Sequence, residues 1–166
     1  MSLRYRVGLS VVLFLFCTGF DRLSKDYAQR NLATAAPLSL LNDTLRIQYA
    51  ENPGAMLGIG ASMPDEIRFA LFVVAVSAAL VTLLAYAIGT HSMDKLQFFG
   101  LLLVGSGGIG NLVDRLTNKG AGIDFLNIGV GSLRTGIFNL ADVFIVAGLV
   151  LVVLASTRRP ILHTES

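Results

Sequence analysis

The sequence is poor in the residues that most metal sites and nucleophilic catalytic sites use. It has one cysteine, Cys17, so neither an internal disulfide nor a cysteine pair for a metal is available. Its two histidines, His91 and His163, are far apart, and His163 belongs to a polar tail. A zinc site and a serine–histidine or cysteine–histidine catalytic set are therefore poor explanations for this chain.

Charge is also scarce in this sequence. Only 14% of the 166 residues are charged, whereas a soluble domain carries about 25%. The net charge is +2 and no dense basic run occurs, which argues against a nucleic-acid partner. Since 54% of the residues are hydrophobic, water is not the only solvent that this chain meets.

Four apolar segments stand out, over about 4–21, 69–89, 96–113 and 137–157. A helix needs about 20 apolar residues to cross the hydrocarbon core of a bilayer. The first segment alone is short enough to be a signal peptide, but no small-residue cleavage site follows it. We therefore predict four transmembrane helices in one integral membrane domain, residues 1–166. Within the first helix, we expect Cys17 to be a buried or lipid-facing thiol, and Arg4 and Arg6 to snorkel to the headgroups.

The charges that flank the segments predict the orientation. Four spans put both termini on one side, and the pairs Arg4/Arg6 and Arg158/Arg159 flank the spans tightly there. The raw count of Lys and Arg points the other way, with five of the 13 on the terminal side. The positive-inside rule weighs short flanks near helix ends, so we expect both termini in the cytoplasm.

Two long loops, 21–68 and 114–135, then share the face opposite the termini. Within them, "LRIQYA" (45–50) alternates apolar and polar residues, as a short strand does. The stretch "LNIGVGSLRTG" suggests a second strand and a turn. We predict an all-α polytopic membrane protein with a small strand-rich cap on that face.

Two acids stand out by their position. Asp142 lies one turn into the last span, with Asn139 on the same helix face three residues before it. A charge in a membrane segment is costly, so it usually faces a bundle interior or a wet cavity. The simpler alternative is a helix-start carboxylate that faces the positive end of the helix dipole. For Asp124 the simpler alternative is a solvated loop acid, and for Asp114 an interfacial ion pair with Arg115.

Two carboxylates that meet at a membrane face suit the activation of water. Like charges in close contact cannot both ionise cheaply, so such a pair shares a proton and supplies a base and an acid. The base takes a proton from water, and the acid polarises the carbonyl that the water attacks. This is the chemistry of an aspartic protease.

Five short blocks, in order along nearly the whole chain, resemble the lipoprotein signal peptidase (signal peptidase II) family of bacteria. They are "DRLSK" (21–25), "NPGAM" (52–56), "GGIGNLVDR" (107–115), "GIDF" (122–125) and "FNLAD" (138–142). The resemblance implies a membrane aspartyl endopeptidase that cleaves diacylglyceryl-modified prolipoproteins just before the lipidated cysteine. It implies four transmembrane helices with a periplasmic β-cradle and a loop helix, in the bacterial inner membrane, with the active site near the periplasmic surface.

The resemblance also implies the site residues. The catalytic pair falls on Asp124 and Asp142. The supporting polar residues fall on Asp21, Lys25, Asn52, Gly54, Asn111, Asp114, Arg115, Asn139 and Ala141. No cofactor or metal is implied, a monomer suffices, and globomycin-type inhibitors are expected to lodge between the two aspartates. The partners are the lipid-modified prolipoprotein and membrane lipids.

The resemblance is weakest just after Asn52. The family often has an aromatic residue or alanine followed by phenylalanine where this chain has Met56 and Leu57, which we expect to cover the lipid moiety. Glu51 either faces solvent or tunes the pair, and the glycines of 50–61 suggest a moving flap. Two other functions remain open, a small proton or cation channel and a non-catalytic protein that binds lipoproteins.

Overall fold

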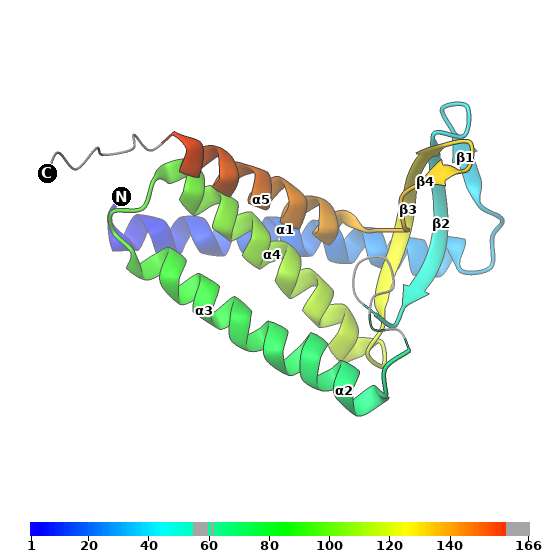
Figure 1. Cartoon of the computed structure of the whole chain (residues 1–166), viewed down its shortest axis with the longest axis horizontal. Helices are drawn as coiled ribbons and strands as arrows, with labels where there is room; N and C mark the ends of the chain where they lie inside the picture. The colour runs from blue at the N-terminus through cyan, green and yellow to red at the C-terminus, as the bar shows by residue number, and fades with distance from the viewer. Residues whose placement is uncertain (55–59, 61, 159–166) are drawn as a thin grey trace, which may run out of the picture.

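Four long apolar helices run alongside one another in the computed structural model, which describes residues 1–54, 60 and 62–158 (Figure 1). The first is α1 (Leu3–Leu32). The second is continuous through α2 (Asp65–Phe69), η2 (Ala70–Ala75) and α3 (Val76–Gly89). The third and fourth are α4 (Lys95–Thr117) and α5 (Leu140–Thr157). By length and composition, each of the four can cross a membrane.

Helix α1 extends well past the apolar segment and into residues predicted to belong to the first loop, 21–68. Its buried residues beyond Cys17 are Asp21, Lys25 and Ala28, which follow helical spacing. The polar run that begins at Asp21 is therefore the amphipathic end of a helix, and its buried stripe faces the other helices. Of the two positions expected for Cys17, the buried one is correct, since the residue is 2% exposed.

The expectation that Arg6 snorkels to the headgroups is wrong. Arg6 is 1% exposed, and its guanidinium donates to the carbonyl oxygens of Thr90 and Ala87, both at 2.5 Å. It also lies 4.6 Å from the ring centre of Phe98. The last carbonyls of a helix lack partners within the helix, so this cation satisfies the end of α3 and ties it to α1.

Helices α4 and α5 approach each other at backbone distance. A Cβ atom added to Gly100 would lie 2.7 Å from the carbonyl oxygen of Gly148, and one added to Gly148 would fall against the carbonyl oxygen of Gly100. A Cβ atom added to Gly107 would likewise fall against the carbonyl oxygen of Ala141. Small residues that permit such contact are typical of helix pairs in membranes. Helices α4 and α5 are therefore the most closely packed pair of the bundle.

The two long loops meet in one antiparallel sheet at the end of the bundle opposite the N-terminus (Figure 1). Its order is β1 (Leu38–Leu40), β2 (Leu45–Asn52), β3 (Gly122–Val130) and β4 (Leu133–Arg134). The central pair, β2 and β3, joins the first loop to the second, with partners that run from Leu45↔Ile128 to Asn52↔Gly122. Both predicted strands are confirmed.

The sheet is also tied to the start of α5. Phe138 exchanges backbone hydrogen bonds with Leu126, at 2.8 Å in each direction, and its carbonyl oxygen accepts a further bond from the Phe125 N–H. This connection fixes β3 relative to the first turn of α5, which brings the "GIDF" and "FNLAD" blocks together.

Some expectations fall wholly or partly outside the described residues. Met56, Leu57 and Gly58 are among these, as is part of the 50–61 segment expected to form a flap. The described residues between β2 and α2 form turns and bends, so the loop helix implied by the resemblance is not among them.

Candidate active site

Asp124 lies on β3 and is buried, with 4% of its surface exposed. One carboxylate oxygen accepts from the Asn139 side-chain amide at 2.7 Å, and the other accepts from the Asn52 side-chain amide at 3.1 Å. Burial raises the pKa of Asp124 above its usual range, and the nearby negative charge of Asp142 adds to this, while the two amides oppose it. Asp124 therefore holds its proton to a higher pH than an exposed aspartate does.

Asp142 is the third residue of α5 and part of a capping box. Its backbone N–H donates to the side-chain oxygen of Asn139 at 3.0 Å, and its carboxylate accepts from the Asn139 backbone N–H at 3.1 Å. The other carboxylate oxygen accepts from the Asn111 side-chain amide at 2.8 Å. The helix-start alternative thus describes the geometry correctly, but Asp142 also lines a cavity together with Asp124.

Asn139 connects the two carboxylates. Its side-chain amide donates to Asp124 and also to the side-chain oxygen of Asn111, at 3.1 Å, while its backbone N–H donates to Asp142. Asn139 thus binds both acids, Asp124 through its side chain and Asp142 through its backbone N–H. The side chain is 2% exposed, so these bonds lie away from bulk water.

The two aspartates open onto a cavity of about 730 Å³. Its apolar wall comes from the second long helix and from α5, with Phe72 and Val76 on one side and Val143, Ile145 and Val146 on the other. Phe72 belongs to the π-helical segment η2, and π-helical turns often occur at functional sites. The cavity therefore combines two acids with an apolar channel that runs along the helices.

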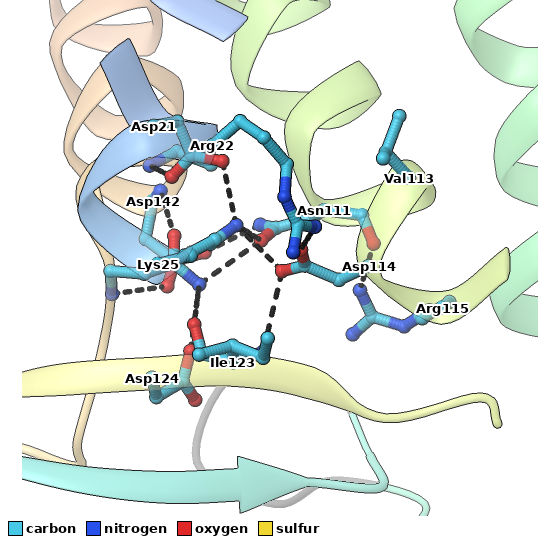
Figure 2. Close-up of polar contacts among 12 residues, drawn as sticks. Asp21, Arg22, Lys25, Asn111, Val113, Asp114, Arg115, Ile123, Asp124 and Asp142 are labelled. Atoms are coloured by element: carbon cyan, nitrogen blue, oxygen red, sulfur yellow. Dashed lines mark hydrogen bonds and ion pairs between the residues drawn. The ribbon is translucent and has the colours of Figure 1, made fainter. Parts of the chain in front are cut away.

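Lys25 is fully buried and lies between two carboxylates (Figure 2). Its ammonium group is 2.7 Å from Asp21 and 2.7 Å from Asp114, and it donates to the side-chain oxygen of Asn111 at 3.1 Å. Because that oxygen faces the Lys25 cation, the amide nitrogen of Asn111 must point to Asp142. Lys25 therefore sets which end of the Asn111 amide meets the site.

The two carboxylates that Lys25 neutralises hold the elements of the site in place. Asp21 accepts from the backbone N–H of Ala141 at 2.8 Å, in the first turn of α5. Asp114 accepts from the backbone N–H of Ile123 at 3.3 Å, next to Asp124 on β3. Ala141 is fully buried, in the closely packed region between α5 and α4.

The alternative that Asp114 forms an ion pair with Arg115 is wrong. Asp114 pairs instead with Lys25 and with Arg22, the latter at 2.8 Å, because these cations project from α1 towards it. Arg115 donates to the backbone carbonyls of Asn111, at 2.9 Å, and Gly54, at 2.7 Å. It thereby anchors the chain just after β2 to the end of α4.

The structure brings all eleven residues implied by the resemblance into one region. Asn52 belongs to it through Asp124 and through its side-chain oxygen, which accepts from the Gly54 N–H at 3.0 Å. Glu51 is exposed and accepts from the Tyr49 hydroxyl at 2.8 Å, so its side chain faces away from the pair. Among the described residues, no group of three histidine, cysteine or acidic side chains could hold a metal ion.

Two residues of this region were missed in the sequence. Arg22 completes the partners of Asp114, and its place one turn before Asp26, with which it also pairs, was the available signal. Phe72 forms part of the cavity wall, and nothing in an uninterrupted apolar run distinguishes it from its neighbours.

The chain is similar in sequence and in fold to known bacterial membrane proteins. The family described as signal peptidase (SPase) II matches residues 13–158. The lipoprotein signal peptidase of Syntrophus aciditrophicus (strain SB) is 32% identical over 147 residues, which cover 86% of this chain and 91% of that protein. That of Burkholderia mallei (strain SAVP1) is 32% identical over 153 residues, which cover 92% and 87%. A solved bacterial membrane enzyme has a similar fold, with a TM-score of 0.81 at 22% identity over 96% of this chain and 94% of the other.

Proposed function

The chain belongs to the signal peptidase II family and is thus a membrane peptidase, and we propose that it removes the signal peptide from diacylglyceryl-modified prolipoproteins. The cut falls just before the lipidated cysteine, and the peptidase is of the aspartic type. One observation carries the proposal: Asp124 and Asp142 are joined through Asn139 at the head of an apolar cavity.

The reaction follows from the different surroundings of the two acids. Asp124 holds the shared proton, because its burial favours the neutral form. The ionised Asp142 takes a proton from a water molecule, whose oxygen bonds to the carbonyl carbon of the scissile peptide. Asp124 gives its proton to the carbonyl oxygen as the tetrahedral intermediate forms.

The collapse of the intermediate restores both acids. The proton on Asp142 moves to the peptide nitrogen as the carbon–nitrogen bond breaks, and a hydroxyl proton of the intermediate returns to Asp124. The products are the carboxyl end of the signal peptide and the free amine of the lipidated cysteine. The amide partners of the two carboxylates, Asn111, Asn139 and Asn52, keep them oriented through both steps.

The surroundings of the pair support a substrate that lies in the membrane. The cavity continues from the acids along η2, α3 and α5, between apolar side chains such as Val76 and Val146. A signal-peptide helix would occupy this space, with its scissile bond at the sheet end where water has access. We place both termini in the cytoplasm of a bacterial cell and the active site near the periplasmic face of the inner membrane. One copy of the chain supplies both acids, so a monomer suffices.

A globomycin-type inhibitor would act by occupying the space between the two acids. Such a compound should then compete with substrate and lose affinity when either aspartate is replaced by alanine. The proposal depends on Asp124 and Asp142 lining one cavity.

The arrangement of buried polar groups argues against a conducting function. A relay needs polar steps across the whole membrane. Between the Arg6 end and the Asp21 end, the buried polar side chains of the described residues are those of Ser10, Cys17 and Ser106. Both serines donate to backbone carbonyls of their own helices. They are therefore bonded locally and do not form a chain.

The test of the proposal is cleavage of a lipid-modified prolipoprotein by the purified chain in detergent. Mass spectrometry should find a product that begins at the lipidated cysteine, and the same precursor without its lipid should be cut poorly or not at all. A folded preparation that binds the precursor without cutting it would favour the non-catalytic alternative. Proton flux in liposomes without peptidase activity would favour the channel.

A further inference from the structure

A second, smaller cavity of about 320 Å³ lies next to the active-site cavity, at the sheet end of the helices. Phe72 and Arg115 line both cavities and so form the wall between them. The full lining is Asp65, Arg68, Phe69, Phe72, Val73, Arg115, Leu116, Lys119 and Gly120. We refer to it as the basic cavity.

The charges of the basic cavity are mainly of one sign. Three of its lining residues are cations, Arg68, Arg115 and Lys119, and one is an acid, Asp65, which pairs with Arg68. Both terminal nitrogens of Arg115 donate to backbone carbonyls of the chain. Arg115 therefore contributes positive charge to the cavity wall but few hydrogen bonds to a bound anion. Lys119 is exposed and follows the end of α4. The cavity therefore carries a net positive charge that attracts an anion, with the exposed Lys119 as its main donor and with Arg68 shared between the anion and Asp65.

The other half of the lining is apolar and open to the outside of the bundle. Phe69 is 55% exposed and Leu116 is 59% exposed, one from the second long helix and one from α4. Both lie close to the ends of their apolar segments, where the hydrocarbon region meets the headgroups. A free anion would need only the cations, whereas exposed apolar side chains beside a cationic rim match a headgroup with acyl chains attached.

We propose that the basic cavity binds the phosphate of an anionic phospholipid, whose acyl chains lie against Phe69 and Leu116. Basic pockets between transmembrane helices are a recurrent way to hold anionic headgroups. Because Arg115 also holds the carbonyls of Gly54 and Asn111, the bound phosphate would sit against a residue that positions the active site. The proposal does not depend on the peptidase reaction, so it can fail or succeed independently of it.

The experiment measures lipid binding with matched variants. Purified wild-type chain, Lys119→Gln, Arg68→Gln and Lys95→Gln are titrated with phosphatidylglycerol in detergent, and bound lipid is counted by native mass spectrometry. Lys95 is the control, since it is an exposed lysine on the same helix as the cavity wall but at the opposite end of α4. Diacylglycerol with the same acyl chains tests the need for phosphate, and inorganic phosphate is added as a competitor.

A site of this kind gives a defined result. One phosphatidylglycerol binds per chain, and Lys119→Gln and Arg68→Gln each weaken it about fivefold, as expected for one cation near a membrane surface. Lys95→Gln leaves binding unchanged, diacylglycerol binds weakly to all four proteins, and millimolar phosphate does not displace the lipid. The unfolding temperature of each variant in a neutral detergent, compared with that of the wild type, shows that the protein is folded.

Two results would overturn the inference. Equal weakening by Lys95→Gln and Lys119→Gln would show only a general attraction between lipid and a basic surface. Displacement by inorganic phosphate at the same concentration range would show a site for a free anion, and the lipid assignment would be wrong.

Discussion

Replacing Asp142 by asparagine should abolish cleavage while it leaves the fold intact. The carboxylate accepts two hydrogen bonds, one from the Asn111 amide at 2.8 Å and one from the Asn139 backbone N–H at 3.1 Å. An asparagine at this position has one oxygen and one NH₂ group, so one of these donors would face another donor. Asn111 cannot turn its amide to help, because its oxygen already faces the Lys25 cation.

The magnitudes separate the two effects of this substitution. Loss of one accepted bond at a helix N-terminus costs about 0.5–2 kcal/mol of the free energy of unfolding. A protein whose free energy of unfolding is about 5–15 kcal/mol remains folded after such a loss. Removal of the catalytic base should lower the cleavage rate by about 10²–10⁴-fold or more, since base catalysis alone supplies that factor. A change in folded population cannot account for a loss of that size.

The assay compares wild type and Asp142→Asn on a diacylglyceryl-prolipoprotein in the same detergent, with thermal unfolding of both proteins measured in parallel. The control is Asp94→Asn, because Asp94 caps α4 at the opposite end of the bundle by accepting from the Leu96 and Gln97 N–H groups. It removes the same charge from a helix start far from the site, and it should cleave like wild type. If Asp142→Asn also cleaves at the wild-type rate, Asp142 is a capping acid and nothing more, and the catalytic assignment is wrong.

Three further predictions test the surroundings of the pair. Lys25→Met should destabilise the protein by about 3–5 kcal/mol, because it leaves the buried Asp21 without a cation and leaves Asp114 with Arg22 alone, and a large drop in unfolding temperature would show this. Gly107→Ala should cost about 1–3 kcal/mol through overpacking against α5, whereas Gly19→Ala, with open space around it, should be neutral or stabilise by up to about 1 kcal/mol; equal effects would contradict the packing described. In the pH profile of cleavage, Asn52→Ala should move the basic limb to higher pH, because the Asn52 amide lowers the pKa of Asp124 and its loss keeps that proton on longer. A profile that stays in place would show that Asp124 does not carry the shared proton.

The helices, the strands and Asp142 could be predicted because each leaves a local signal. Long apolar runs predict helices that can cross a membrane, and alternation over a few residues predicts a strand, as β2 shows. Asp142 is conspicuous since it is a charge in an apolar helix. Asp124 can be recognised as a catalytic candidate only when it is known to lie near Asp142. The resemblance alone indicated this proximity, because it depends on the bridge between Leu126 and Phe138, which leaves no local pattern in the sequence.

The partners of the charged residues could not be predicted, because they depend on which helix faces sit together. The neighbour of Asp114 in sequence is Arg115, yet successive residues on a helix point about 100° apart, and its true partners come from α1. The sequence around Arg6 predicts a charge that flanks a membrane span. Its true role depends on the last carbonyls of α3, which lie beside it only in the folded bundle. The end of α1 is polar, so apolar content predicts the first part of this helix alone, whereas its continuation follows from the helical spacing of Asp21, Lys25 and Ala28.

The pairing of Asp21 with Lys25 has a consequence for how the protein is made. Their contact is one helical turn long, so it can form as soon as α1 exists, whereas Asn111 and Ala141 lie 86 and 120 residues further along. A newly inserted α1 thus enters the edge of the bilayer with Asp21 and Lys25 already paired. The pairing lowers the free-energy cost of placing these two charges near the hydrocarbon region. Later, as α4 and α5 arrive during synthesis, the same two groups keep this contact and gain further partners on the new helices, Asn111 and Ala141. The pair first neutralises α1 during biogenesis and then becomes the point on which the finished site assembles.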